Sequence, residues 1–386
     1  MGRVLLRLLL LFLPPLVPVA VYVGEAPAPA PDPVDSRIPS TALFVLGDSS
    51  VNCGDNTLFY PLLPLNFSSS FLCDASRHRL LPDLIADLMR LSRPPPFYGL
   101  NGSAAGAYGG VNYGSAQGTI VSSAAAGFSF GGGGYFLVQS LNQQVRQVSE
   151  AIQLIQIEAG PAAARHVASS ALFLLSFGAD DYFRLLARGS ESDASAPKYG
   201  RRGFARFLVA RMIYAIRHLY EADVRRVAVM GVGPLGCSPR VLWEGRRRLD
   251  GLDCDEEVNE VIQGYNAKLA ARLAKLRSEL PDSEFVFCDV YKGVMNIISN
   301  PGIYGFENVR KACCGLGQFG GMIGCLAKEM ECDVPQKHVW WDFYSTTEAV
   351  NALLANWTWW PPSPERQLSI CEPMFLKQLA RHGIAG

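Results

Sequence analysis

Short apolar runs alternate with segments of helical periodicity along most of the chain. Apolar residues at three- and four-residue spacing predict helices, and the apolar runs between them predict buried strands. The predicted strands occupy 42–46, 171–177, 227–232 and 284–290, and 339–341 is expected to supply the last one. The predicted helices occupy 80–91, 140–158, 202–222 and 258–280, with a further helix running through Ala355.

This alternation of strand and helix predicts an α/β fold. We expect a single doubly wound domain over 40–386, with a mostly parallel sheet and helices on both of its faces. No internal repeat or change of composition indicates a second domain.

The first residues have the pattern of an export signal. Residues 1–26 combine Arg3 and Arg7 with an apolar stretch, prolines and small residues, which is typical of a secretory signal peptide. An Ala/Pro-rich tract over 27–39 predicts an extended linker. No later stretch is apolar and long enough to predict a transmembrane span, so we expect a secreted, extracellular protein.

Net charge argues against a polyanionic partner. Lys plus Arg and Asp plus Glu both total 35, which gives a formal net charge of +0. No nucleic-acid surface is therefore expected.

The cysteines fit an oxidising compartment. Six of the ten form local clusters that predict disulfides, and these are Cys237, Cys254, Cys313, Cys314, Cys325 and Cys332. A zinc site is the alternative for the last four, but they lack a paired CxxC arrangement, so no metal is expected. Three Asn-x-Ser/Thr sequons predict glycans at Asn66, Asn101 and Asn356.

Polar residues follow several predicted strands at once. Gly47, Asp48 and Ser49 follow the first strand, and Asp180 follows the strand that ends near residue 177. Ligands of open α/β sheets bind beyond the carboxyl ends of the strands, so these groups should meet there. The turn over 112–118 should lie beside the first strand end. Acyl transfer needs such a set: a hydroxyl nucleophile, a base with an orienting carboxylate, and donors for the oxyanion.

Ordered sequence blocks strengthen this interpretation. The chain resembles the plant GDSL esterase/lipase family, a branch of the SGNH hydrolases, from about residue 42 to 355. The blocks that carry the resemblance are FVLGDSSVNCGDN, GVNYGSAQGTI, SFGADDY, VAVMGVGPLGCSP, PDSEFVFCDVY, NPGIYGF, ACCGLGQFG and WWDFYSTTEAVN.

The resemblance implies roles for particular residues. Ser49 is implied as the nucleophile and, through its backbone N–H, as an oxyanion donor. A second backbone donor is implied from the 115–118 turn, at Ala116 or Gly118. Asp342 is implied as the carboxylate that orients the base.

Two positions depart from the family pattern. Asp180 stands where the family has the oxyanion Asn of Gly-x-Asn-Asp, and Ser345 stands where it has the base His of Asp-x-x-His. An ionised Asp180 would repel the oxyanion, and only a protonated one could donate the missing bond. A serine cannot replace the imidazole base near neutral pH. Replacing both, by Ser345→His and Asp180→Asn, is therefore expected to raise activity.

Other histidines are weaker candidates for the base. His338 is too far back along the predicted strand, and His166, His218 and His382 have no strand end nearby. His78 follows the long loop after Ser49 and remains open as a base, although an exposed loop histidine is the favoured interpretation.

Two functional interpretations follow. By resemblance the chain is a carboxylic-ester hydrolase that acts on a small acyl-ester or lipid-like ligand without a cofactor. The alternative is a catalytically inactive extracellular ligand-binding or scaffolding member of the same family. The sequence does not indicate an oligomeric state.

Overall fold

The computed structural model describes residues 41–53, 78–100, 104–121, 139–187, 200–245, 254–325, 327–362 and 368–381. These residues belong to one compact unit, Arg37–Gly386. The predicted signal peptide and linker lie outside the described residues. Within the described residues, no helix has the length and apolar character needed to cross a bilayer.

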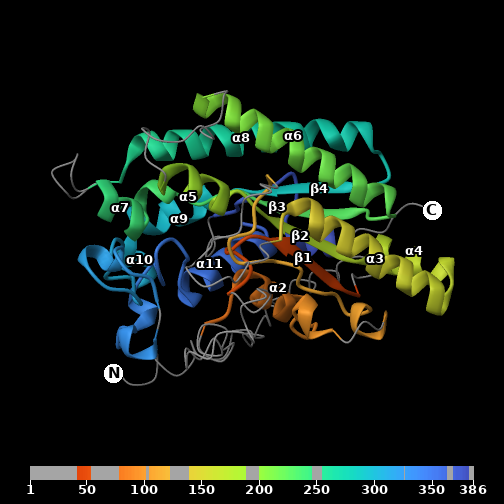
Figure 1. Ribbon diagram of the computed structural model, residues 1–386, viewed down its shortest axis with the longest axis horizontal. Helices are drawn as coiled ribbons and strands as arrows, with labels where there is room; N and C mark the ends of the chain where they lie inside the picture. The colour runs from red at the N-terminus through yellow and green to blue at the C-terminus, as the bar shows by residue number, and fades with distance from the viewer. Residues whose placement is uncertain are drawn as a thin grey trace, which may run out of the picture. The chain divides into compact units, whose positions relative to one another are not determined.

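A mostly parallel sheet forms the centre of this unit (Figure 1). Its strands lie in the order β1 (Leu43–Gly47), β2 (Leu172–Ser176), β3 (Arg226–Met230), β4 (Glu284–Cys288) and β5 (Cys371–Glu372). The first four strands are parallel, and β5 pairs antiparallel with β4. The predicted α/β fold is confirmed.

Helices connect and cover the strands. The α-helices are α2 (Leu81–Met89), α3 (Leu141–Ala159), α4 (Pro161–Ser170), α5 (Ala179–Ala187), α6 (Gly200–Glu221), α7 (Pro239–Gly245), α8 (Glu256–Glu279), α9 (Val290–Ser299), α10 (Pro301–Tyr304), α11 (Glu348–Trp359) and α12 (Leu376–Arg381). Short 3-10 helices are η1 (Phe97–Gly99), η2 (Ala104–Ala107), η3 (Leu235–Cys237), η4 (Gln318–Gly320), η5 (Lys328–Met330) and η6 (Pro335–Lys337).

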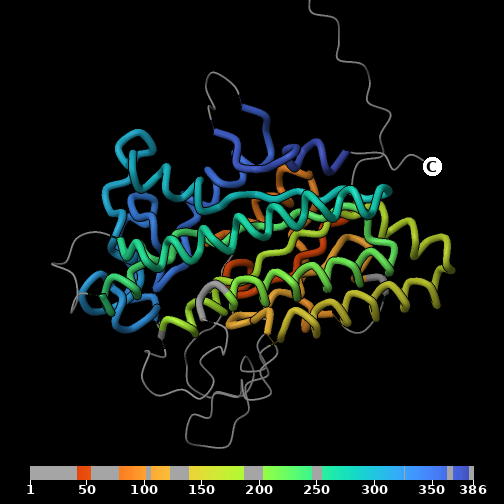
Figure 2. The backbone as a smooth tube through the Cα atoms, turned by 90° about the horizontal axis from the view of Figure 1, so that it is seen from above, coloured from red at the N-terminus to blue at the C-terminus, as the bar shows by residue number. Residues whose placement is uncertain are grey.

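Alternate residues of β1 enter two different cores. Phe44 and Leu46 pack in the core that includes α3, α6 and α8, whereas Leu43 and Val45 pack in the core that includes α2, α9, α11 and α12. Successive side chains of a strand point to opposite faces, so burial on both faces explains the continuous apolar run. Figure 2 shows the long helices α6 and α8 side by side.

The segment around Asn112 continues the sheet beyond β1. Val45 N–H donates to Val111 O at 2.9 Å, and Tyr113 N–H donates to Val45 O at 2.7 Å. This pairing is an isolated bridge between Val45 and Asn112, and Asn112 is not part of a strand. After β1 the chain first pairs with one edge of β1 at Asn112, and it later forms β2 along the other edge of β1. Such a reversal is where open α/β sheets bind ligands, and it places the site at the carboxyl end of β1.

The last strand was predicted wrongly. Residues 339–341 join no sheet, because their backbone bonds go to loops: Val339 N–H donates to Asn308 O, and Trp340 O accepts from Cys313 N–H. Trp340 is buried in the core that also holds α11, which explains the apolar run. The edge strand is instead β5, much further along the chain.

Candidate active site

Gly47 ends β1 where no side chain fits. A Cβ there would lie 2.2 Å from Val51 Cγ2 and 2.6 Å from Ser176 O. The buried amide of Gln144 on α3 holds this glycine, because its Oε1 accepts from Gly47 N–H and its Nε2 donates to Gly47 O, both at 2.8 Å. The strand therefore turns sharply at a fixed point, directly before the polar residues.

Asp48 is fully buried and fixes the shape of that turn. Its Oδ1 accepts from Ser50 N–H at 3.0 Å and from the Ser50 hydroxyl at 2.7 Å, and its Oδ2 accepts from Asp180 N–H at 3.3 Å. Burial and the nearby Asp180 carboxylate raise the pKa of Asp48 to about 7. Two carboxyl groups in one desolvated space disfavour two negative charges.

Ser49 is half-buried beyond the strand end, as the sequence predicted for a nucleophile. Its hydroxyl donates to Asp180 Oδ2 at 2.8 Å and accepts from Gln117 N–H at 2.8 Å. Its own N–H also donates to Asp180 Oδ2, at 2.9 Å. Ser49, the implied nucleophile, is thus hydrogen-bonded to Asp180, one of the two residues that depart from the family pattern.

Asp180 lies in the first turn of α5 and is 2% exposed. Its Oδ1 accepts from the Tyr344 hydroxyl at 2.6 Å. Burial raises the pKa of Asp180, although the hydrogen bonds from Tyr344 and Ser49 and the positive charge of Arg184 oppose that rise. Asp180 thus accepts hydrogen bonds from Tyr344 and Ser49, and it would have to be protonated to donate one to an oxyanion.

The turn after Asn112 lies against Ser49, and Gln117 is its closest donor. Gln117 takes a left-handed conformation with φ of 61°, which turns its N–H toward Ser49 Oγ. Gly118 N–H instead donates to Ser115 O at 2.8 Å, so this implied oxyanion donor is already engaged. Ala116 is half-buried in the same turn. The sequence interpretation included this turn but overlooked Gln117, whose left-handed backbone is not visible in the sequence.

The loop that contains Asp342 and Ser345 also reaches the site, but through a different residue. Asp342 Oδ1 accepts from Ser345 N–H at 2.9 Å and from Tyr344 N–H at 3.3 Å, so this carboxylate stabilises its own loop. Tyr344 then extends to Asp180. Tyr344 was overlooked because the family pattern draws attention only to the first and last positions of this block.

His78 differs from the exposed loop residue that the sequence favoured. It is 7% exposed, and its ring stacks on Trp341 with centroids 4.5 Å apart. Burial lowers the pKa of His78, whereas the charges of Asp342 and Glu348 oppose that change. Among the described residues, no imidazole forms a hydrogen bond with the Ser49 hydroxyl.

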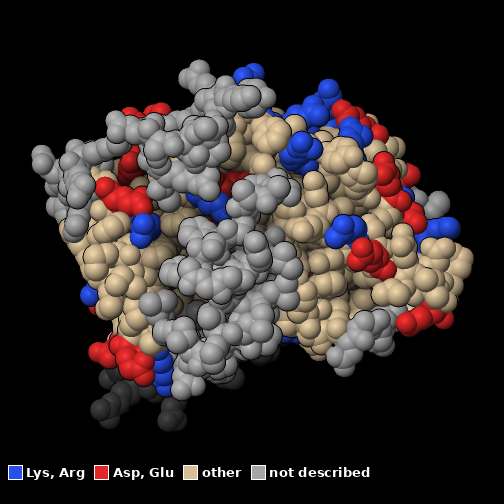
Figure 3. Space-filling view, viewed as in Figure 1, with Lys and Arg blue, Asp and Glu red and all other residues tan. Residues whose placement is uncertain are grey.

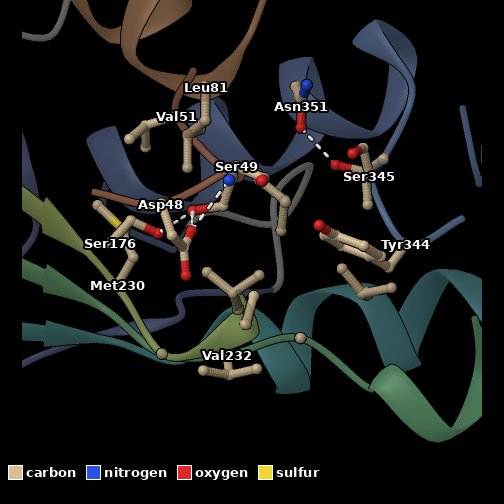
Figure 4. Close-up of a pocket in the computed structure, with 18 of the residues that line it drawn as sticks. Asp48, Ser49, Val51, Leu81, Ser176, Met230, Val232, Tyr344, Ser345 and Asn351 are labelled. Atoms are coloured by element: carbon tan, nitrogen blue, oxygen red, sulfur yellow. Dashed lines mark hydrogen bonds between the residues drawn. The ribbon is translucent and has the colours of Figure 1, made fainter. Parts of the chain in front are cut away.

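A mainly apolar pocket of about 90 Å³ opens beside Ser49 (Figure 4). Its apolar wall includes Val51, Leu81, Met230, Val232, Trp340 and Leu354. Tyr344 and Ser345 line it together with Ser49, so residues far apart in the sequence meet there. An apolar cavity with a few convergent polar groups is typical of a small-molecule site.

The structure joins all six predicted cysteines, as Cys237–Cys254, Cys313–Cys332 and Cys314–Cys325. It adds Cys288–Cys371, which the sequence did not predict because 83 residues separate the two. Cys313 and Cys332 lie close to His338 in an arrangement that could suit a metal, but their sulfurs are bonded to each other.

One of the three predicted glycosylation positions can be placed. Asn356 is exposed on α11, where its Nδ2 donates to Ala352 O at 3.0 Å. Asn66 and Asn101 lie outside the described residues.

Comparison with known proteins gives the same family over most of the chain. Residues 43–358 match the family model described as GDSL-like Lipase/Acylhydrolase. The chain is similar to the Arabidopsis thaliana GDSL esterase/lipase At1g71250, with 30% identity over 336 residues, 85% of this chain and 87% of the relative. It is also similar to the Arabidopsis thaliana GDSL esterase/lipase At1g71691, with 29% identity over 357 residues, 87% of each chain. The chain therefore belongs to the GDSL lipase/acylhydrolase family.

Proposed function

We propose that this protein is a secreted carboxylic-ester hydrolase in which Ser49 is the nucleophile. The observation that carries the proposal is the position of the Ser49 hydroxyl. It lies beyond the carboxyl end of β1, on the wall of an apolar pocket, bonded to a carboxylate acceptor and to a backbone N–H donor. A serine with an adjacent proton acceptor is the arrangement that acyl transfer requires.

The pocket favours an ester whose acyl group is apolar. Aliphatic and aromatic side chains form most of its wall, and Ser49, Tyr344 and Ser345 contribute hydroxyls along one side. A small acyl ester or a lipid-like ester would therefore bury its hydrocarbon there while its carbonyl carbon meets Ser49. Lipids, cutin-like esters and acetylated polysaccharides remain the candidate substrates.

Charge on the surface does not favour a polyanionic partner. Basic and acidic groups are interspersed on the face shown in Figure 3. This distribution agrees with the formal net charge of +0. A substrate bound through apolar contacts fits such a surface better than a nucleic acid does.

Secretion is supported by the amino-terminal pattern and by the disulfides. Disulfides form and persist in oxidising compartments. The mature chain should begin between Ala20 and Glu25 or just after Ala26, and mass spectrometry of secreted material measures this directly. Recovery of intact residues 1–20 in that material would contradict the signal peptide.

A second candidate function is ligand binding without turnover. The observation that favours it is Ser345, which occupies the position of the family's base, while no described imidazole bonds to Ser49. A protein of this kind would keep the pocket and lose the chemistry.

Hydrolysis of 4-nitrophenyl acetate and 4-nitrophenyl butyrate separates the two functions. We expect slow hydrolysis by the natural protein and loss of that activity in Ser49→Ala. The control is Ser278→Ala, which removes an exposed serine hydroxyl on α8, far along the chain from the site. Activity that persists in Ser49→Ala would refute the proposed nucleophile. Absence of any Ser49-dependent turnover would favour the binding function.

A further inference from the structure

Three hydrogen bonds converge on the Asp180 carboxylate, and two of them come from Ser49, one from its hydroxyl and one from its N–H. We propose that Asp180 is the general base that accepts the Ser49 proton, in place of the imidazole that position 345 lacks. The inference rests on the proposed ester hydrolysis at Ser49 and specifies how that site can work.

The distances of these contacts carry the argument. The Ser49 hydroxyl and the Ser49 N–H both donate to Asp180 Oδ2, at 2.8 Å and 2.9 Å, and the Tyr344 hydroxyl donates to Oδ1 at 2.6 Å. An ionised carboxyl group can only accept hydrogen bonds, so with Asp180 ionised the Ser49 hydroxyl donates to it. The 2.6 Å contact with Tyr344 has the length of a charge-assisted hydroxyl-to-carboxylate bond. The proton that must leave Ser49 is therefore already directed at its acceptor.

Tyr344 is the residue that positions this carboxylate. Its ring packs on Phe183, with centroids 4.6 Å apart, and Phe183 lies on α5, three residues after Asp180. Residues three apart share one face of a helix, so α5 presents the carboxylate and the support for its partner together. Burial raises the pKa of Tyr344, so its hydroxyl stays a neutral donor.

The other candidate base is less well placed. The His78 ring stacks on Trp341 and is influenced by Asp342, but it donates no bond to Ser49 and does not line the pocket among the described residues. A general base must lie within hydrogen-bond reach of the proton that it removes. Asp180 meets that condition and His78 does not.

The proposed reaction uses only the ester and water. As Ser49 Oγ bonds to the ester carbonyl carbon, its proton passes to Asp180 Oδ2 and the carbonyl electron pair moves onto oxygen. The tetrahedral intermediate collapses, the bond to the alcohol oxygen breaks, and Asp180 returns the proton to that oxygen. Water then attacks the acyl-serine and gives a proton to Asp180, which passes it to Ser49 Oγ as the carboxylic acid leaves.

Backbone groups remain to stabilise the oxyanion in this scheme. Gln117 N–H lies 2.8 Å from Ser49 Oγ, so it is close to the place where an ester carbonyl would bind for attack. Ser49 N–H is held by Asp180 while that group is charged. Once Asp180 has taken the proton it is a weaker acceptor, which makes the Ser49 N–H available at the moment the oxyanion forms.

The charged groups around Asp180 set the pH dependence. Asp48 lies beside it at the end of β1, Asp181 and Arg184 share α5 with it, and Tyr344 faces it from the loop. Tyr265 on α8 faces Asp48 and Asp181. Because burial raises the pKa of Asp180, activity should increase with pH above the range in which an exposed aspartate, of pKa about 3.9, ionises. The midpoint belongs to the coupled Asp48 and Asp180 pair.

The first test is Asp180→Asn, assayed as the Ser49-dependent kcat/KM for 4-nitrophenyl acetate from pH 4 to 9. Removing the base should lower kcat/KM by about 10²- to 10⁴-fold. It should also abolish the increase of kcat/KM with pH, the rising limb of the pH profile. The matched control is Asp181→Asn, which neutralises the next carboxylate of α5; Asp181 accepts from Ile120 and Val121 N–H and does not touch Ser49. The control should keep the rising limb, and circular dichroism compares the folding of both variants.

A second variant tests the positioning role of Tyr344. In the natural protein, the hydrogen bond from the Tyr344 hydroxyl to Asp180 Oδ1 lowers the pKa of Asp180. Tyr344→Phe removes this bond and should therefore raise that pKa. The rising limb should therefore move to higher pH. A merely structural role would lower the activity at every pH and leave the midpoint in place.

The decisive comparison places Asp180→Asn in two backgrounds. With Ser345 present it should reduce activity, because the base is lost. With Ser345→His present, an imidazole beside Asp342 can take over, and Asp180→Asn should then increase activity by about 10²- to 10³-fold, because the amide can donate to the oxyanion. The sign of the effect thus depends on residue 345.

The possible outcomes distinguish this inference from the proposed function. An increase with Asp180→Asn in both backgrounds would overturn the inference and leave Ser49 as the nucleophile, and loss of activity in His78→Ala would then identify that base. Activity that is unchanged by Ser49→Ala would overturn the proposed function. Turnover that appears only with Ser345→His would overturn both and support the binding function.

Discussion

Asp48 and Asp181 are two buried carboxyl groups at the strand ends, and each has a pKa raised to about 7. Burial is the largest cause in both, and the Asp180 charge adds to it. Neutral side chains are therefore favoured in the folded state. Ionisation of these two buried groups lowers the free energy of unfolding, so the folded protein becomes less stable as the pH rises through their pKa.

The stability difference between Asp181→Asn and the natural protein should depend on pH. The unfolded aspartate titrates near pH 3.9 and the folded one near 7, so its favourable contribution is complete below about pH 4 and is lost as the pH rises through 7. The asparagine side chain does not ionise, so the variant does not lose this contribution as the pH rises. Relative to the natural protein, Asp181→Asn should become more stable between pH 4 and 8, as measured by thermal unfolding at each pH. A difference that stays constant over this range would contradict the raised pKa.

The sequence predicted which residues meet at the site better than it predicted their state. Ser49 and Asp180 could each be placed at the end of a strand from the hydrophobic pattern alone, whereas the pairing of these two strands is visible only in the structure. The protonation of Asp180 depends on burial and on Tyr344, which approaches from more than 160 residues away in the chain. A local pattern contains no information on such a contact.

At the scale of elements, α3 fixes the end of β1. Gln144 is fully buried on α3 and bonds to both backbone groups of Gly47, two residues before Ser49. Gly47 O also accepts from Ser115 N–H at 3.0 Å, which connects the 115–118 turn to the same point. A helix, a strand and a turn thus share one small set of hydrogen bonds beneath the nucleophile.

Gln144→Leu should weaken both the fold and the site. The substitution leaves Gly47 N–H buried without its acceptor, at a cost of about 1–3 kcal/mol in the free energy of unfolding. Urea unfolding measures this cost, and the rate of 4-nitrophenyl acetate hydrolysis should fall with it, because Ser49 loses its fixed position. The control is Gln153→Leu, an exposed residue of the same helix, which should change stability by less than about 0.5 kcal/mol. An effect on stability no larger than that of the control would contradict this role of Gln144.

Elements with strong periodicity were predictable, and short ones were not. The prediction of a helix over 140–158 agrees closely with α3, and the four parallel strands follow the apolar runs. β5 has two residues, too few for any periodic pattern, and its pairing depends on contacts with distant parts of the chain. The strand prediction for residues 339–341 was wrong because a buried loop can be as apolar as a strand.

At the scale of the whole molecule, disulfides stabilise the loops and one edge of the sheet. Cys237–Cys254, Cys313–Cys332 and Cys314–Cys325 close loops of 11 to 19 residues, and Cys288–Cys371 joins β4 to β5. In the chain-entropy account, the bridge across the longest loop restricts the unfolded chain most.

Peptide mapping of secreted protein under non-reducing conditions should find these four linkages. Replacing both Cys288 and Cys371 by alanine should lower the free energy of unfolding by about 2–5 kcal/mol. Free thiols at all of these positions in protein secreted by a eukaryotic cell would contradict the pairing and the compartment together.

We expect the Cys288–Cys371 bridge also to protect the edge of the sheet from self-association. β5 covers the edge of β4 with only two residue pairs, Phe287 with Glu372 and Cys288 with Cys371. If the bridge fails to form, so short a strand can detach and leave the backbone groups of β4 open to another chain. Protein made in a reducing bacterial cytosol should therefore collect in inclusion bodies, whereas the periplasm or a eukaryotic secretory host should yield dispersed material.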